Sequence, residues 1–314
     1  GVDFALFRHR LSGTIEYYNK YSVDLLAAIN GSPTQGFGYT TLMTNNGKMV
    51  NRGVEITLSG EIIRQKDFSW NASLLYAFNR NKVKHISVQP SLWDSRISMP
   101  TSYPMVGKPL YGIYAYKWAG LNENGDPQVY DAENNVTSGP ARDYHALVYC
   151  GTTVPIHNAS LTNVLRYKGF EFSAMLILDA GHKLRSSNIP SINMSNGRIT
   201  STAKGIVDRW TQPGDVTDVP RLLFSNDTEN FNTHRTELYR YSDLFVYDAS
   251  NIRLSNISLA YRVPAHWCKK ISLSGARLQF NVENVATFAF DSKANYDLGG
   301  KVKPNYVWGL YLNF

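Results

Sequence analysis

The stretch Pro304–Phe314 reads P-N-Y-V-W-G-L-Y-L-N-F and alternates between two kinds of side chain. Successive residues of an extended strand point to opposite faces. One face therefore carries Tyr306, Trp308, Leu310, Leu312 and Phe314. An apolar face with aromatic residues near both ends, on a strand that closes the chain, is typical of a lipid-facing strand in a membrane-spanning barrel. The last strand of a soluble β-sandwich is the alternative, because it shows the same alternation.

The same alternation recurs in segments of about ten residues, the length that a tilted strand needs to cross the hydrocarbon layer. Apolar and small or polar residues alternate over Phe68–Phe78, and also over Val54–Leu58 just before it. The polar stretch Arg64–Asp67 joins these two runs, which predicts a hairpin with a short turn. The other predicted strands are Val2–His9, Ser12–Lys20, Asn158–Tyr167, Phe170–Ala180, Asp248–Val263 and Ile271–Glu283. These six, the two runs Val54–Leu58 and Phe68–Phe78, and the terminal strand make nine predicted strands.

Short turns alternate strictly with long connections along this chain. Compact soluble domains rarely contain structureless connections longer than about 15 residues. Outer-membrane barrels have short periplasmic turns and longer extracellular loops. The sequence therefore predicts an all-β fold, a transmembrane antiparallel β-barrel with Phe314 at the periplasmic side. Its expected extracellular loops are Tyr21–Arg52, Asn79–His157, Gly181–Tyr247 and Asn284–Lys303.

The odd strand number indicates that the barrel is incomplete. Bacterial single-chain barrels have even strand numbers, with both chain ends at the periplasmic side. The sequence also opens directly in a predicted strand, with no signal peptide before it. We therefore expect residues 1–314 to be the carboxy-terminal portion of a larger barrel. Alone, this portion would leave two open edges in lipid, where each unpaired backbone group costs several kcal/mol.

Composition fits a barrel and argues against two other classes. Apolar residues make up 43% of the chain, the mean hydropathy is -0.29, and no apolar run approaches the about 18 residues of a membrane helix. A spanning protein of this hydropathy must expose only alternate residues to lipid. The formal charge of +7 comes from scattered bases without a Lys/Arg cluster, so we expect no nucleic-acid partner.

No catalytic, metal or cofactor pattern is present. The seven histidines lack a spacing such as H-E-x-x-H, and no G-x-S-x-G elbow occurs, so the chain is not expected to be an enzyme. Cys150 falls in a predicted loop and Cys268 in a predicted turn at the opposite end, which excludes a disulfide between them. The stretch Asn122–Asp126, N-E-N-G-D, is similar to part of a calcium loop but lacks the remaining ligands.

Four segments resemble one family in sequence order. Val106–Tyr130 reads V-G-K-P-L-Y-G-I-Y-A-Y-K-W-A-G-L-N-E-N-G-D-P-Q-V-Y, and Asp208–Arg221 reads D-R-W-T-Q-P-G-D-V-T-D-V-P-R. Ala249–Tyr261 reads A-S-N-I-R-L-S-N-I-S-L-A-Y, and Phe280–Thr287 reads F-N-V-E-N-V-A-T. Together they resemble TonB-dependent transporters of the SusC/RagA type, and the resemblance covers essentially the whole chain. Asn251 and Val282-Glu283 depart from the family pattern, which affects packing more than identity.

The resemblance implies active uptake of a large nutrient across the outer membrane of a Gram-negative bacterium, one of the Bacteroidota. The cargo would be an oligosaccharide or a peptide. It further implies a barrel of about 22 strands that holds a plug, a SusD-like surface lipoprotein as a lid, and energy from TonB. The plug, the TonB-contacting segment and the first strands of such a transporter are not in this chain.

Two sets of residues are candidates for the transport pathway. Loop aromatics can stack on sugar faces or pack the loop against itself or the lid; these are Trp93, Tyr111, Tyr114, Tyr116 and Trp118. Polar residues on the water-facing side of strands could line the pathway or hold the plug by ion pairs, and plug contact is the favoured role because the lumen is largely filled. These are Arg253, Arg277, Gln279 and Glu283.

Two other classes of protein remain as alternatives. A passive outer-membrane porin would share the strands but would need no plug. A secreted β-sandwich adhesin would bind glycans with its long loops and would hide one face of each sheet in a core.

Overall fold

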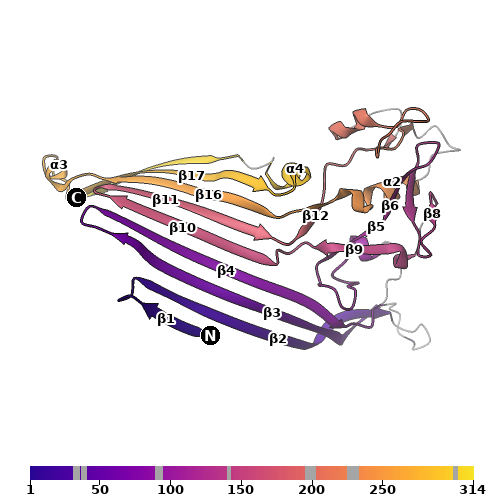
Figure 1. Cartoon of the computed structure of the whole chain (residues 1–314), viewed down its shortest axis with the longest axis horizontal. Coiled ribbons are helices and arrows are strands. Elements are labelled where there is room, and N and C mark those ends of the chain that lie inside the picture. Colours follow the sequence, from indigo (N-terminus) through magenta and orange to yellow (C-terminus); the bar gives the residue numbers. More distant parts are fainter. Residues whose placement is uncertain are drawn as a thin grey trace.

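The structure is a computed structural model that describes residues 1–30, 36, 41–88, 95–139, 143–194, 203–224, 233–299 and 303–314. Its dominant element is one antiparallel sheet, which has nine strands within these residues. Figure 1 shows the strands running side by side, with short turns at one end and longer connections gathered at the other. In sheet order the strands are β1 (Val2–Leu6), β2 (Leu11–Asn30), β3 (Thr41–Arg64), β4 (Phe68–His85), β10 (His157–Tyr167), β11 (Phe170–Ala180), β16 (Asn251–Arg262), β17 (Gly275–Ala289) and β18 (Asn305–Asn313).

The predicted strands and short turns are confirmed, but several boundaries were wrong. The predicted loop Tyr21–Arg52 is mostly strand, because β2 and β3 stay paired from Tyr21↔Val50 to Asn30↔Thr41. Irregular pairing between Ser22 and Leu26 breaks the alternation there, which hid the strand from a search for a period of two. β17 starts at Gly275 rather than Ile271 and runs on to Ala289. The residues just before it follow the short helix α3 (Ala265–Lys269) in the turn.

Pairing register sorts the side chains of the sheet into two faces, since directly paired residues of neighbouring strands share a face. One row crosses six strands as Trp70, Leu165, Phe172, Leu259, Phe280 and Trp308. The neighbouring row on the other face reads Ser69, Arg166, Glu171, Ala260, Gln279 and Gly309. One face is therefore apolar and the other polar across the sheet, as the sequence predicts.

No second layer covers the apolar face of the sheet among the described residues. Trp308 is 78% exposed, and Leu310, Leu278, Leu259 and Phe172 are exposed as well. A sandwich would bury these side chains in a core. A single sheet with one wet and one lipid-facing side leaves them open in the isolated chain, and this is what the structure shows.

Polar side chains on the apolar face have partners. The Trp70 Nε1–H donates to Asn163 Oδ1 at 3.0 Å. The Tyr76 hydroxyl lies 2.9 Å from His157 Nδ1, and the His157 ring also contacts Phe78. These hydrogen bonds reduce the cost of placing polar groups toward hydrocarbon.

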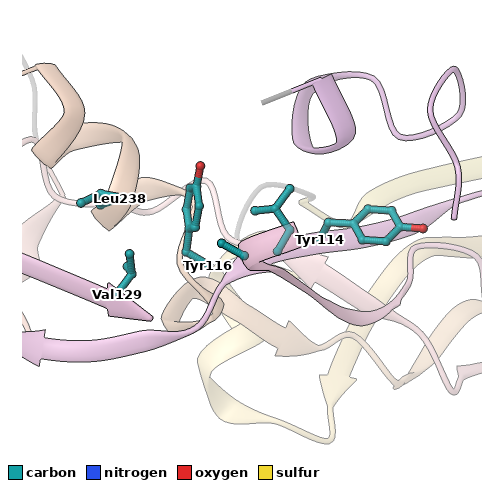
Figure 2. Packing of buried hydrophobic residues seen from close by; sticks show 6 residues of the cluster. Tyr114, Tyr116, Val129 and Leu238 are labelled. Atoms are coloured by element: carbon teal, nitrogen blue, oxygen red, sulfur yellow. The ribbon is translucent and has the colours of Figure 1, made fainter. Parts of the chain in front are cut away.

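The buried core lies in the long connections rather than in the sheet. Tyr114, Tyr116, Val129, Ala146, Leu147 and Leu238 form one cluster, part of which Figure 2 shows. Ile192, Tyr239 and Phe245 form a second. We call the described parts of 95–156, 181–250 and 290–299 the outer-loop assembly. No helix among the described residues is long and apolar enough to cross a bilayer.

Small sheets and short helices frame this assembly. β5 (Gly112–Tyr116) pairs with β9 (Leu147–Thr152), and β6 (Trp118–Leu121), β7 (Pro127–Tyr130) and β8 (Val136–Thr137) form a second sheet. β12 (Lys183–Arg185) pairs with β15 (Val246–Asp248), and β13 (Asn193–Met194) lies parallel to β14 (Leu223–Phe224). The helices are α1 (Ser95–Ser98), α2 (Thr233–Arg240) and α4 (Asn295–Leu298). Short 3-10 turns cover Tyr144–Ala146, Lys204–Asp208, Asp243–Phe245 and Ser292–Ala294.

The two faces of the sheet predict opposite tolerance to charge. Leu74 lies on the apolar face, paired with Leu58 and Leu161, whereas its neighbour Ser73 lies on the polar face, paired with Ser59 and Thr162. Leu74→Arg should lower the free energy of unfolding by about 2–4 kcal/mol, because it places a cation toward hydrocarbon. Denaturant unfolding of the intact protein in lipid vesicles measures this. Ser73→Arg is the matched control, and an equal loss in both variants would contradict the assignment of faces.

Candidate functional site

The polar face of the sheet carries a chain of ion pairs near the short-turn end. Glu171 of β11 accepts from Arg166 Nε at 2.7 Å and from Arg277 Nη2 at 3.2 Å. The three charges come from three strands, β10, β11 and β17. Two of the predicted pathway residues, Arg277 and Gln279, lie here; the Gln279 amide donates to Ser258 and Asn281. The face is polar and hydrogen-bonded within itself.

A bulge places the other two candidates on the same face. Arg253 and Glu283 would lie on opposite faces if β16 and β17 paired regularly, but their register shifts between Leu254 and Asn256. Asn284 absorbs the extra residue with a φ of 54°, a left-handed conformation that asparagine tolerates better than most residues. Arg253 contacts Asp179 at 3.3 Å, and Glu283 is exposed. All four predicted residues therefore share one face, whereas their contact with a plug stays a prediction.

The loop aromatics predicted to touch cargo fall into three groups. Trp93 lies outside the described residues. Tyr111 is 49% exposed, so its ring is open to a ligand or partner. Tyr114 and Tyr116 are each only 1% exposed and sit in the first buried cluster (Figure 2), so for these two the burial supports the packing alternative.

Trp118 is half-buried and fixed at both of its nitrogens. Its backbone N–H donates to Asp243 Oδ1 and its Nε1–H to Asp218 Oδ1, both at 2.9 Å. Its ring lies 5.8 Å from the ring of Tyr239. A ligand could meet only the open part of this ring, so Trp118 stays a candidate beside Tyr111.

Sequence reasoning missed the polar centre of the outer-loop assembly. Asp126 accepts from Arg221 at 3.1 and 2.8 Å, and from Arg235 Nε at 3.1 Å. Arg235 is 3% exposed, and its other nitrogens donate to the Ile192 and Arg221 carbonyls and to Asn193 Oδ1. Asp126, in the connection after β4, is thus joined to Arg221 and Arg235, which both lie in the connection after β11. The sequence shows Asp126 and Arg221 in two separate motifs, and this order alone predicts no ion pair between them.

Burial lowers the pKa of Arg235, whereas the charge and hydrogen bond of Asp126 raise it. The guanidinium still stays charged at neutral pH because its ordinary pKa is so high. Its burial is therefore tolerated only with Asp126 ionised beside it.

The two predicted family motifs contact each other at this centre. Gly125 has a φ of 74°, and a β-carbon there would lie 2.4 Å from the Trp210 ring. The Arg221 N–H donates to the Gly125 carbonyl at 3.0 Å. The N-G-D segment and the W-T-Q-P-G-D-V-T-D-V-P-R segment thus form the two sides of one interface. The calcium-loop alternative fails, because Asp126 pairs with arginines and Asn122 Oδ1 accepts from two backbone N–H groups.

Other titratable groups in the described chain show no arrangement for catalysis or metal binding. Asp248 is partly buried, but hydrogen bonds from Ser250 and Lys183 lower its pKa to about 2. Burial raises the pKa of the Cys150 thiol to about 11, and Cys150 and Cys268 are both free. The described residues contain no group of three His, Cys, Asp or Glu side chains that could hold a metal ion.

Comparisons with known proteins agree on one family. Residues 1–285 match the family described as "TonB dependent receptor-like, beta-barrel". TonB-dependent receptor P3 of Formosa agariphila is 26% identical over 332 residues, covering 99% of this chain and 31% of that protein. TonB-dependent receptor SusC of Bacteroides thetaiotaomicron is 24% identical over 298 residues, covering 90% and 27%. The chain thus spans less than a third of the length of these relatives.

Solved structures show the same fold. The RagAB peptide transporter superposes with a TM-score of 0.75 at 22% identity, covering 99% of this chain and 34% of that chain. The RagAB peptide importer in its "open-open" state gives a TM-score of 0.71, also at 22% identity. At this identity the likeness concerns the fold alone.

The Asp126 centre predicts a selective loss of loop stability. Asp126→Ala leaves the buried Arg235 guanidinium without an acidic partner, which should cost about 3–5 kcal/mol of stability in the outer-loop assembly. Amide hydrogen exchange should then speed up in the segments around Ile192, Arg221 and α2, while strands of the large sheet stay protected. Glu123→Gln is the control, since Glu123 is exposed and its loss removes no such partner. Unchanged exchange in Asp126→Ala would show that the centre does not hold the assembly.

Proposed function

Since the chain belongs to the TonB-dependent receptor-like β-barrel family, we propose that residues 1–314 form the carboxy-terminal portion of an outer-membrane barrel that actively imports a nutrient. The observation that carries this proposal is the single sheet with one apolar and one polar face, capped at one end by a folded loop assembly. The family is one of receptors and transporters, and not of enzymes.

Open sheet edges support the incomplete barrel. Within the described residues β1 and β18 each pair on one side only. In lipid their free N–H and C=O groups would be unsatisfied, so strands from elsewhere must pair with both edges. A barrel of about 22 strands has a lumen wide enough for a plug. The ion-paired polar face, with Arg253, Arg277, Gln279 and Glu283, is the surface we assign to the plug and pathway.

Cargo and partners follow from the resemblance and the exposed loop aromatics. RagAB is described as a peptide importer. For this chain we propose an oligosaccharide or peptide cargo, a SusD-like surface lipoprotein as the lid, and TonB as the source of work. The bacterium would be Gram-negative and one of the Bacteroidota, since the curated relatives named above come from Formosa and Bacteroides. We assign Tyr111 and the open part of the Trp118 ring to contact with cargo or lid, because Tyr111 is exposed and Trp118 is half-buried.

Uptake in cells separates active import from the alternatives. A strain that produces the intact protein should accumulate a labelled oligosaccharide or peptide from a cargo panel, and a protonophore should abolish the accumulation. A passive porin would continue to equilibrate the cargo after the protonophore. A secreted adhesin would remain soluble without detergent and would lack the heat-modifiable gel migration of a barrel. Failure of every cargo in the panel, with the barrel correctly inserted, would reject nutrient import.

The exposed Tyr111 and the half-buried Trp118 are expected to contribute to cargo affinity. Tyr111→Ala and Trp118→Ala should each weaken cargo binding about tenfold, because each removes a stacking surface. Calorimetric titration of the intact protein with its cargo measures this. Tyr167→Ala is the control, since Tyr167 lies beside the short turn at Lys168, at the other end of the sheet. Unchanged affinity in the first two variants would remove both residues as contacts.

A further inference from the structure

The apolar face of β2, β3 and β4, which we call the outward face, changes from apolar to basic between one row of paired residues and the next. Tyr17, Val54 and Phe78 pair side by side and end the apolar rows. The next row on the same face is Asn19, Arg52 and Arg80, and Lys82 follows two residues after Arg80. Since a strand rises about 3.3 Å per residue, Arg80 lies about 7 Å beyond Phe78. The cations therefore stand just outside the aromatic boundary of the hydrocarbon layer.

These cations lack acidic partners in the part of the chain that the structure describes. Arg52 and Arg80 face each other directly across β3 and β4, an arrangement of like charges that destabilises a sheet. The Arg52 Nε–H donates to Asn19 Oδ1 at 3.0 Å, a neutral acceptor that leaves the charge unbalanced. No ion pair joins Arg80 or Lys82 to a described acid. An external anion would relieve the repulsion.

A cleft of about 480 Å³ opens beside these cations, along the outer end of β4. Its basic lining is Arg80, Lys82 and Lys108. Its apolar lining includes Phe78, Val154, Pro155 and Ile156, and Phe78 belongs to the outward apolar face. The cleft thus joins a cationic wall to an apolar wall at the level of the membrane boundary.

One further feature of the cleft suits a phosphate-bearing headgroup. Lys108 Nζ lies 4.8 Å over the Tyr149 ring, which holds this cation at the rim. Lys108 therefore joins Arg80 and Lys82 in the basic lining of the cleft.

We propose that this cleft binds the phosphate-bearing headgroup of an outer-leaflet lipid. Arg80, Lys82 and Lys108 contact the phosphate, and Phe78 meets the start of the acyl region. Arg52 adds positive potential from the next strand. The assignment of a lipid, rather than a soluble anion, rests on the membrane placement proposed above. Bound lipid would fill the wall beside the edge of β4 and anchor the barrel at a fixed height.

The test uses the intact protein purified in a neutral detergent. Native mass spectrometry counts retained lipid after addition of bisphosphorylated lipid A, dephosphorylated lipid A, or inorganic phosphate. The wild-type protein should retain bisphosphorylated lipid A at least tenfold better than the dephosphorylated form. The variant R80Q/K82Q/K108Q should lose this preference. K66Q/K269Q/K270Q removes three cations from the short-turn end and should keep it, which controls for net charge.

Two results would overturn the proposal. Equal retention by R80Q/K82Q/K108Q and wild type would show that the cleft does not hold the phosphate. Tight binding of inorganic phosphate, without preference for the phosphorylated lipid, would assign the cleft to a soluble anion. If the triple variant fails to fold, R80Q and K108Q each provide the same comparison with smaller losses. Cargo uptake is measured in parallel, so loss of lipid preference with uptake intact separates this site from the import function.

Discussion

The whole structure depends on satisfying backbone hydrogen bonds inside the sheet while alternate side chains meet two different environments. Lipid offers no partners to N–H and C=O groups, so each strand must pair on both sides. A slip of one residue would turn every side chain to the wrong face. The row from Trp70 to Trp308 and the neighbouring row from Ser69 to Gly309 show that the register is kept over six strands. Where it shifts, the bulge at Asn284 keeps Arg253 and Glu283 on the polar face.

This constraint explains why the core lies where it does. A sheet between lipid and a water-accessible interior has no apolar side to bury against its own chain. The long connections instead form a core of their own around Tyr114, Tyr116 and Tyr239, and they join through Asp126 and Arg235. The outer-loop assembly is therefore held by packing and ion pairs of its own, and the exposed Tyr111 ring belongs to it.

Sequence analysis predicted the strands whose alternation is regular and the face of each of their residues. It placed Arg253, Arg277, Gln279 and Glu283 on the water-facing side of their strands, but it did not reveal the bulge that keeps Arg253 and Glu283 on one face in the structure. It did not find the ion pairs of Asp126, because Arg221 and Arg235 lie about 100 residues further along the chain and pairing over such separations leaves no local pattern. It left open whether Tyr114 and Tyr116 touch cargo or pack the loop, since an aromatic run looks alike whether the rings are buried or open, and the structure buries both.

The boundary error in β2 and β3 has a physical cause that links to the basic row. Beyond the hydrocarbon layer the outward face of a strand no longer needs apolar residues, although its backbone can stay paired. The alternation of hydrophobicity therefore ends near Tyr17 and Phe78, while the hydrogen-bonded ladder continues to Asn30 in β2 and to His85 in β4. A search for alternating hydrophobicity therefore finds each strand only as far as the edge of the hydrocarbon layer, although the strand itself extends beyond that edge. Asn19, Arg52 and Arg80 are the first residues of the outward face beyond that edge, so the point at which the sequence pattern fails marks where headgroups begin.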